Sequence, residues 1–470
     1  MTTSIDNGIS TRPVTRILAD FVANLRYEDL PAEVTQMARQ SVLDSLGCGI
    51  YGSGTQWVDA VVRTVAQFND ADTASVWGRP IKADVLGAAL INGTAAQGYE
   101  LDDCHDQSMS HYGAGVIPAV LAVAEAMGPF DGRQIITAVV AGYEVGTRVG
   151  NTVSPSAFHR GFHPCGLTST FGAAAAIAKL LELDVDRYVN ALGLAGSQAA
   201  GLMAAQFGAM AKRFHSGKAA MNGIIAALAA REGLTGVRNV LEAPYGGFCS
   251  TYSAEYDLSY ATDGLGEHWE TLRNGFKQYS SLASSQTTVD ALRAIVARTG
   301  LRPEEVADIR VETTEMVYVH CGWPYEYNGE TIAAQMNLPF TAAVTLIDGT
   351  AFIDGYTDDR LNDPQILALA EKVNVEVATD LDASGKQEMR AVRVTVTTTS
   401  GAKHTENVTY RSGHWKAPLS QEDLTAKFHN LAERVITAEA AREIARIVAD
   451  LDQRTDPVKE LARHLQVTKS

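Results

Sequence analysis

The sequence predicts a mainly α fold, with a large all-helical domain and a smaller α+β domain. Apolar residues recur at helical spacing in nearly every segment from residue 30 to about residue 265. Alternating β-branched and polar residues, typical of half-exposed strands, begin only near residue 300, and no GxGxxG motif follows a strand. The chain of 470 residues is long enough for two or three domains. We therefore place the helical domain at residues 1–268 plus 412–470 and the α+β domain at residues 269–411.

Helices fill the first part of the chain. Pro31, a favourable first helical residue, opens the segment 30–50, in which apolar residues return on one face. Gly142, Gly146 and Gly150 share one face of a later helix and predict close contact with a neighbouring helix. The predicted helices after residue 80 cover residues 85–99, 117–128, 132–150, 171–183, 188–204 and 219–233.

The pattern of the sequence changes near residue 300. Residues 306–315 and 389–401 alternate between β-branched and polar side chains, which predicts two half-exposed strands. Segments 417–435 and 438–451 are again helical and could extend either domain; we assign them to the helical domain. Helical patterns cover residues 287–299, ahead of the first strand, and residues 330–349 and 363–373, between the two strands.

The net charge of −16 limits the range of partners. It argues against nucleic acid and against an anionic membrane surface, although a few cations inside a pocket can still bind an anionic substrate. The five cysteines are scattered without a CxxC pair, so they predict neither a zinc ribbon nor an Fe–S cluster. The sequence predicts a cytoplasmic protein with reduced thiols. It has no secretory signal and no apolar tract long enough to span a membrane.

Four short polar segments carry ionisable side chains, and three of them lie just before an alanine- or valine-rich helix. Helix N-termini carry free N–H donors and a partial positive charge, so they suit carboxylates. Histidine and lysine beside them supply proton donors and acceptors near neutral pH. Several such segments meeting at one cavity would bind a small polyanion. The residues concerned are Glu100, Asp102, Asp103, Cys104, His105, Asp106 and His111; His159 and His163; Lys212, Arg213, His215 and Lys218; and Lys277 and Tyr279.

Each of these segments also has a purely structural explanation. An acidic cluster such as Asp102–Asp106 is more often a solvated or capping turn than a site. A metal site competes with that explanation, but the residues are adjacent rather than spaced like ligands. His163 alone could be a structural histidine and Lys212 a surface lysine. Cys104 beside a histidine suggests a nucleophile, although no oxyanion motif follows it.

Several stretches, taken in order, resemble the MmgE/PrpD family, which includes 2-methylcitrate dehydratase, cis-aconitate decarboxylase and iminodisuccinate epimerase. They cover nearly the whole chain: LPAEV, VLDSLGCGIYG, YELDDCH, SHYGAGVIPAVLAVAEAMG, AGYEVGTRVG, GFHPCGLTSTFGAAAAIAKLLELD, KRFHSGKAA, FKQYSSLASSQTTVDAL and LPFTAAVTLIDG. The resemblance implies a helical domain and a smaller α+β lid with the site between them. It also implies a homodimer and a reaction that needs neither a metal nor an organic cofactor.

The resemblance implies particular site residues as well. Matched position by position, the pocket residues are Asp102, His111, His163, Lys212 and Lys277. Their less secure neighbours are Glu100, Asp103, Cys104 and His215.

This chain departs from the family pattern around the pocket. Cys104 replaces a small hydroxyl residue, Gln286 replaces a histidine after the Lys-x-Tyr stretch, and Phe340 replaces a tyrosine of some relatives. The residues Ser280-Ser281-Leu282 replace a turn that contains proline and cysteine, and one extra residue separates Asp103 from His111. We count Tyr279, Gln286 and Phe340 among the candidate substrate-binding residues.

The chemistry that this site predicts is proton transfer at carbon beside a carboxylate. We expect Lys212 and Lys277 to fix substrate carboxylates, His111 and His163 to form an acid–base pair, and Asp102 to orient one imidazole. The leading interpretation is a lyase for a small di- or tricarboxylate, with dehydration favoured over decarboxylation. An epimerase or isomerase using the same enolate-like state and a non-catalytic carboxylate binder stay open, as do a thiol-dependent hydrolase and a metal enzyme.

Overall fold

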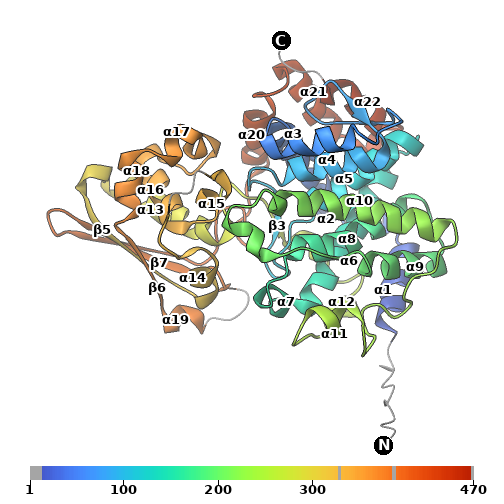
Figure 1. Ribbon diagram of the computed structural model, residues 1–470, viewed down its shortest axis with the longest axis horizontal. Coiled ribbons are helices and arrows are strands. Elements are labelled where there is room, and N and C mark those ends of the chain that lie inside the picture. Colours follow the sequence, from blue (N-terminus) through green and yellow to red (C-terminus); the bar gives the residue numbers. More distant parts are fainter. Residues whose placement is uncertain (1–12, 327–329, 384–387, 467–470) are drawn as a thin grey trace, which may run out of the picture.

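The computed structural model describes residues 13–326, 330–383 and 388–466. Two lobes lie side by side, one built of helices and one of helices over a small sheet (Figure 1). The core of the helical lobe draws on residues from Val14 to Trp269 and again from Phe428 to Leu465, whereas the core of the α+β lobe runs from Tyr279 to Val396. The predicted fold class, mainly α with a smaller α+β domain, is confirmed.

Five helices pack against one another inside the helical lobe. They are α4 (Val85–Ala96), α5 (Gly113–Met127), α6 (Gly132–Val153), α8 (Pro164–Leu180) and α10 (Ala211–Arg231). A Cβ atom at Gly142 would lie 2.8 Å from Val116 and 2.9 Å from the carbonyl oxygen of Gly172. A Cβ atom at Gly146 would lie 2.5 Å from the Tyr112 ring. These glycines therefore allow the close approach that their spacing predicts.

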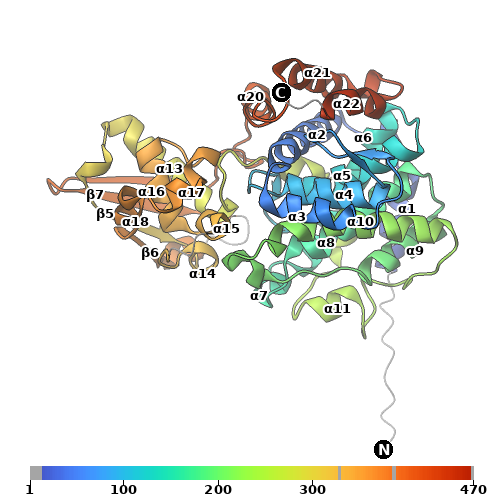
Figure 2. The ribbon, with the colours of Figure 1, turned by 45° about the horizontal axis from the view of Figure 1, so that its top comes forward.

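The last helices of the chain return to the helical lobe. Helix α20 (Gln421–Ala432) packs against α2 (Ala32–Gly52), and α21 (Ala438–Ala449) and α22 (Pro457–Leu465) complete the same side (Figure 2). The buried Lys427 donates to Asp44 at 2.6 Å and to the carbonyl oxygen of Leu101 at 2.5 Å. This lysine ties α20 both to α2 and to the acid-rich loop after α4.

The α+β lobe contains a four-stranded sheet in the order β6-β5-β7-β8. Strands β5 (Val306–Thr313) and β6 (Val373–Val377) are parallel, while β7 (Val392–Thr398) and β8 (Lys403–Val408) continue the sheet in antiparallel fashion. Every second residue of β7 is buried, as its alternation predicts. Strands β6 and β8 are edge strands that the sequence pattern missed, because β6 follows directly on a predicted helix and the exposed β8 has no buried residues.

The helices of this lobe match the predicted segments with one correction. Helices α13 (Gln286–Thr299) and α18 (Pro364–Ala370) lie where expected. The predicted helix 330–349 is divided into α15 (Thr331–Gln335) and α16 (Leu338–Asp348). The division falls at Asn337, whose side chain accepts a hydrogen bond from the Phe340 backbone N–H and so caps the second helix.

One short strand pair joins the two lobes near the acid-rich loop. Strand β3 (Cys104–His105) pairs with β4 (Asn274–Gly275), opposing Cys104 to Gly275. The segment that carries Lys277 is thereby held against the loop that carries Glu100 and Asp102.

No helix in the described part of the chain is long and apolar enough to cross a membrane. The remaining elements are α1 (Val14–Asn24), α3 (Gln56–Val65), α7 (Ser156–His159), α9 (Val185–Gly196), α11 (Phe248–Tyr252), α12 (Ser259–Thr262), α14 (Glu315–Cys321), α17 (Asp358–Leu361), α19 (Thr379–Asp382), β1 (Ala74–Ser75) and β2 (Lys82–Ala83).

Candidate active site

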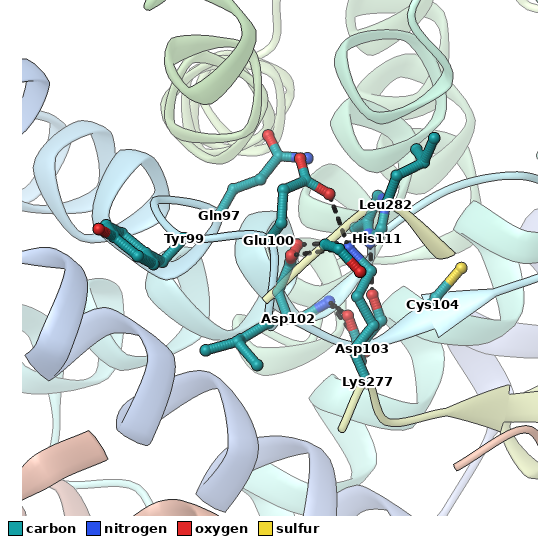
Figure 3. Close-up of polar contacts among 12 residues, drawn as sticks. Gln97, Tyr99, Glu100, Asp102, Asp103, Cys104, His111, Lys277 and Leu282 are labelled. Atoms are coloured by element: carbon teal, nitrogen blue, oxygen red, sulfur yellow. Dashed lines mark hydrogen bonds and ion pairs between the residues drawn. The ribbon is translucent and has the colours of Figure 1, made fainter. Parts of the chain in front are cut away.

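The centre of the candidate site is the buried carboxylate of Glu100. Its Oε1 accepts from Lys212 and Arg213 of α10. Its Oε2 accepts from Lys277 Nζ at 2.9 Å (Figure 3). Burial would raise the pKa of Glu100, but Lys212, Lys277 and Arg213 hold it well below its usual value. Glu100 itself has φ 57°, a left-handed conformation that is uncommon for a residue with a side chain. The loop thus maintains a strained backbone in order to present this carboxylate to the cations.

His111 and Asp102 contact each other close to Lys277. His111 Nδ1 lies 2.5 Å from the carbonyl oxygen of Asp103 and 3.4 Å from Asp102 Oδ2. Because a carbonyl oxygen only accepts, Nδ1 of the neutral ring carries the hydrogen and Nε2 keeps its lone pair. Burial and the nearby Lys277 lower the pKa of His111 to about 4, so the ring is neutral near pH 7. Asp102 Oδ1 lies 3.5 Å from Lys277 Nζ.

Lys277 and Lys212 respond differently to this environment. Burial would lower the pKa of Lys277, but Glu100 and Asp102 raise it above its ordinary value. Burial lowers the pKa of Lys212 and outweighs the opposing effect of Glu100. Lys277 lies two residues after the end of β4, and Lys212 lies in the first turn of α10.

A pair of imidazoles lies at the start of α8. His163 is the N-cap residue of α8, and its Nδ1 is 2.9 Å from Nδ1 of His215 on α10. Burial and neighbouring Lys212 lower the pKa of His163 well below its usual value. Burial and Lys218 lower the pKa of the half-buried His215 to about 4. Both rings are therefore neutral near pH 7 in the absence of an anion.

A cavity of about 400 Å³, counting its open mouth, brings several of these groups together. Four predicted residues line it: Cys104, His111, His163 and Lys212. The apolar part of its wall consists of Met109, Phe158, Pro164, Met203, Leu282 and Ala283. His320 and Arg390, which sequence reasoning did not select, complete the lining. The α+β lobe therefore supplies Leu282, Ala283, His320 and Arg390, and the helical lobe supplies the remainder.

Arg390 and His320 add a cation and an imidazole from the α+β lobe. Arg390 pairs with Asp106 through Nη1, and its buried Nε has no hydrogen-bond partner among the described residues. His320, in α14, has Nδ1 3.2 Å from the Ser284 hydroxyl. Burial and Arg390 lower the pKa of His320 to about 3. Neither residue belongs to a motif, so only their place in the folded chain reveals them.

Four predicted residues have side chains that are engaged elsewhere. Asp103 caps α5, accepting from the Gly113 backbone N–H at 3.0 Å, from the Tyr143 hydroxyl and from Asn274. The other three are Tyr279, whose hydroxyl donates to Asp290 at 2.6 Å; Gln286, which donates to the carbonyl oxygens of Tyr279 and Ser281; and Phe340, which packs on Tyr325 and Tyr356. These contacts place all four in the supporting structure around the cavity.

Cys104 lines the cavity as a thiol. Burial and the nearby Asp106 raise its pKa to about 12. A protonated thiol is a weak nucleophile, which counts against the thiol-dependent hydrolase. Within residues 13–326, 330–383 and 388–466, no three His, Cys, Asp or Glu side chains are grouped so that they could hold a metal ion.

A larger surface hollow lies elsewhere, between α5 and α22. It measures about 1080 Å³ with its open solvent space and is lined by Lys82, Glu125, Lys459 and Arg463 among others. Its lining includes no histidine. We place the candidate site in the smaller cavity because buried imidazoles and cations from distant segments converge there.

Comparisons with known proteins give an independent view of the chain. The family model described as the MmgE/PrpD N-terminal domain matches residues 16–261, and the MmgE/PrpD C-terminal domain matches residues 279–453. The chain is 32% identical over 472 residues to cis-aconitate decarboxylase of Aspergillus terreus, covering 95% of each. It is 28% identical over 457 residues to cis-aconitate decarboxylase of Homo sapiens, covering 95% of this chain and 93% of the relative. It is 22% identical over 386 residues to mitochondrial 2-methylcitrate dehydratase of Yarrowia lipolytica, covering 77% and 72%.

Proposed function

This chain belongs to the MmgE/PrpD family, as its sequence resemblance predicts, and we propose from that premise that it is a lyase for a small tricarboxylate. The observation that carries the proposal is a buried cluster with more cations than carboxylates, of which Lys212 lines the cavity. Lys212, Arg213 and Lys277 surround two carboxylates, Glu100 and Asp102. Such an excess inside a chain of net charge −16 provides the local attraction that a polyanion needs.

We propose decarboxylation as the leading reaction, ahead of the dehydration that the sequence alone favours. The decarboxylases among the relatives align over 95% of this chain, whereas the dehydratase aligns over 77%. The apolar wall formed by Met109, Phe158, Met203 and Leu282 supports the same choice. An ionised carboxylate against apolar side chains is destabilised relative to neutral carbon dioxide. Dehydration stays the second candidate because of the dehydratase relative.

In the proposed mechanism, the C–C bond to the departing carboxylate breaks and leaves its electron pair on the remaining unsaturated acid. Lys212 and Lys277 stabilise that charge through the retained carboxylates. A protonated His163 gives its proton to carbon, which completes the reaction. His111, whose Nε2 keeps a lone pair, is the proton acceptor that dehydration or epimerisation would need. The Asp103 carbonyl oxygen, which accepts from Nδ1, holds this ring in position, and the Asp102 carboxylate, 3.4 Å away, would stabilise its imidazolium.

The test is incubation of the purified protein with cis-aconitate, 2-methylcitrate and C4 dicarboxylates in deuterated water, followed by mass spectrometry. Loss of carbon dioxide with one deuterium added at carbon would support decarboxylation, and loss of water would support dehydration. Deuterium uptake without loss of mass would identify an epimerase. Binding without any reaction would identify the non-catalytic binder and reject the proposal.

Matched variants test the residues. His163→Asn keeps a group that can contact His215 but cannot donate as an imidazolium, so kcat should fall by about 10²- to 10⁴-fold. His159→Gln changes a nearby exposed histidine of α7 and should keep wild-type turnover. Equal turnover by the wild type and His163→Asn would remove His163 from the mechanism.

The homodimer is a further proposal that rests on the family resemblance, and sedimentation equilibrium tests it.

A further inference from the structure

Arg390 faces the cavity with a hydrogen-bond donor that no described residue uses. The residue is 7% exposed and lines the cavity. Its Nη1 pairs with Asp106, whereas its buried Nε has no hydrogen-bond partner among the described residues. Buried polar groups are nearly always hydrogen-bonded, and a buried guanidinium N–H without a partner is costly. The unsatisfied donor therefore points to an anionic ligand as its partner.

The positive charge of Arg390 is only partly balanced inside the protein. Its partner Asp106 also pairs with Arg411 Nη2 at 3.3 Å and lies 3.2 Å from His414 Nε2. One carboxylate thus serves two guanidinium groups. Arg390 therefore remains able to attract an anion in the cavity through a charge-assisted hydrogen bond.

The junction of β5 and α14 holds the backbone on either side of Arg390. Thr314 Oγ1, at the N-cap of α14, donates to the carbonyl oxygen of Met389 at 2.6 Å. Thr313 Oγ1, at the end of β5, donates to the carbonyl oxygen of Ala391 at 2.9 Å. These two contacts fix the position of Arg390 relative to α14.

His320 of α14 adds a second donor to the same part of the cavity. Its Nδ1 lies 3.2 Å from the Ser284 hydroxyl, and its ring lies edge-on to Phe158 with centroids 4.8 Å apart. These contacts leave Nε2 for the cavity that His320 lines. When the Ser284 hydroxyl donates to Nδ1, Nε2 of the neutral ring carries the hydrogen and can donate to a carboxylate.

The proposed decarboxylation defines what this pair can bind. An acid with three carboxylates loses one and retains two. The departing carboxylate cannot lie against a guanidinium, because that cation would stabilise the ionised group relative to neutral carbon dioxide. Among the described residues that line the cavity, the cations are Lys212 from the helical lobe and Arg390 from the α+β lobe. We propose that Lys212 binds one retained carboxylate and that Arg390 and His320 bind the other; this inference rests on the proposed function.

This subsite makes the number of carboxylates the basis of substrate selection. A tricarboxylate fills both cation positions and still places its third carboxylate against the apolar wall. A dicarboxylate that fills both positions has no carboxylate to lose, and one that uses the apolar wall leaves Arg390 unpaired. A site built to bind a polar group rejects an analogue that lacks it, because the buried partner is then left unsatisfied.

The main test is the Arg390→Met variant, studied by calorimetry with propane-1,2,3-tricarboxylate (tricarballylate). This acid has neither a double bond nor a hydroxyl group, so it can bind without reacting. Methionine keeps an apolar stem but has no charge and no N–H donor. We expect the Kd for tricarballylate to rise by roughly 10- to 100-fold. With cis-aconitate, KM should rise by a similar factor while kcat stays within about threefold, as expected for a contact made equally in the ground state and the transition state.

Two further variants separate binding from overall charge and from packing. Arg393→Met removes an arginine of β7 that pairs with Glu312 and Asp380 outside the cavity, so its Kd for tricarballylate should stay within about twofold. Arg390→Ala leaves room for a small cation. Added ethylguanidinium should restore tricarballylate binding in this variant but not in Arg390→Met, where the side chain fills the space.

The contribution of His320 is tested by a pair of substitutions. His320→Gln keeps an N–H donor, whereas His320→Phe keeps a ring without one. We expect the Kd for tricarballylate to rise by about 3- to 10-fold in His320→Phe and by less in His320→Gln. An unchanged Kd in His320→Phe would remove this residue from the subsite.

Other outcomes would overturn the subsite as a whole. Equal affinity of the wild type and Arg390→Met for tricarballylate would do so, as would an equal loss in Arg393→Met, since that loss would come from overall charge. A loss that ethylguanidinium does not restore in Arg390→Ala would assign Arg390 a purely structural role. A wild-type protein that neither binds tricarballylate nor turns over any tricarboxylate would refute the proposed function, and the subsite with it.

Discussion

Glu100 controls the charge of the cavity at the scale of a single residue. It holds the side chains of Lys212, Arg213 and Lys277 in the absence of a ligand. A substrate carboxylate would compete with Glu100 for the same cations. Binding therefore exchanges one anionic partner for another, which limits the desolvation cost of presenting unpaired lysines to the cavity.

Replacing Glu100 should expose this dependence. Glu100→Gln leaves three buried cations facing a neutral amide, so we expect the free energy of unfolding to fall by about 3–5 kcal/mol. Adding a tricarboxylate should raise the melting temperature more in the variant than in the wild type, because the ligand supplies the missing charge. Denaturant titration and thermal melts with and without cis-aconitate measure both effects.

The control for this variant is Asp186→Asn. Asp186 forms exposed pairs with Arg16 and Arg238, so its loss should change stability by less than about 1 kcal/mol. Equal stability of Glu100→Gln and the wild type would show that the three cations do not depend on this carboxylate.

The buried histidines predict a loss of stability in mild acid. The pKa values of His111 and His320 are lowered to about 4 and about 3, against about 6.5 for an unfolded chain. Between pH 6.5 and pH 4 the unfolded state binds more protons at these positions, so stability rises with pH and is lost as pH falls through this window. Each ring contributes about 1.4 kcal/mol per pH unit at most.

Comparing the pH dependence of stability in the wild type and in one histidine variant isolates the contribution of that buried ring. The pKa of Asp103 is raised to about 7 by burial, so this carboxyl acts in the opposite direction between about pH 4 and pH 7. We therefore compare the wild type with His320→Gln by urea titration at pH 7, 6 and 5. The variant should lose less stability on acidification than the wild type, and parallel slopes would contradict the assignment.

At the scale of elements, α10 places two site residues through its contact with α4. Lys212 and His215 lie in its first turns, and Gly217 follows where α10 crosses α4. A Cβ atom at Gly217 would collide with the carbonyl oxygen of Leu90 and the hydroxyl of Thr94. The cation and the imidazole are thus positioned by a backbone contact farther along the same helix.

The Gly217→Ala variant tests this arrangement. The added methyl group must push α10 away from α4, and we expect a loss of about 1–3 kcal/mol in stability together with a lower kcat/KM. Gly54→Ala is the control, because the nearest atom to its Cβ would be 3.9 Å away. Denaturant titration and steady-state kinetics on both variants give the comparison. An unchanged kcat/KM in a destabilised Gly217→Ala would show that this contact stabilises the fold but does not position the site residues.

At the scale of the whole molecule, Asp106 links the two lobes. This carboxylate of the helical lobe pairs with Arg390 beside β7, with Arg411 at 3.3 Å and with His414 at 3.2 Å. The same Arg390 lines the cavity. The relative position of the lobes and the charge of the cavity therefore depend on one buried carboxylate.

Removing that charge should loosen the contact between the lobes. Asp106→Asn leaves Arg390 and Arg411 without their anion, so we expect a larger radius of gyration in X-ray scattering and a drop in kcat/KM of roughly 10-fold or more. Asp354→Asn removes an exposed pair with Arg434 and is the control. Wild-type scattering and kinetics in Asp106→Asn would show that other contacts hold the lobes.

The sequence predicts regular structure better than the cavity. Alternation in β7 and apolar spacing in α13 act locally, so they can be read from adjacent residues. The gathering of His111, His163 and Lys212 at one cavity followed from family resemblance more than from spacing. His320 and Arg390 were missed because tertiary packing alone brings them there. Tyr279, two residues after Lys277, turns instead toward Asp290 because the chain bends at residues 278–281 and does not keep the alternation of a strand, in which both side chains would share a face.

The division of the cavity lining between the lobes has a consequence for inhibitors. Lys212 comes from one lobe and Arg390 from the other. A compact dianion that engages both side chains at once would bridge the lobes and restrain their separation. Such a compound should show slow-onset inhibition and a long residence time, because its release would wait for the lobes to part.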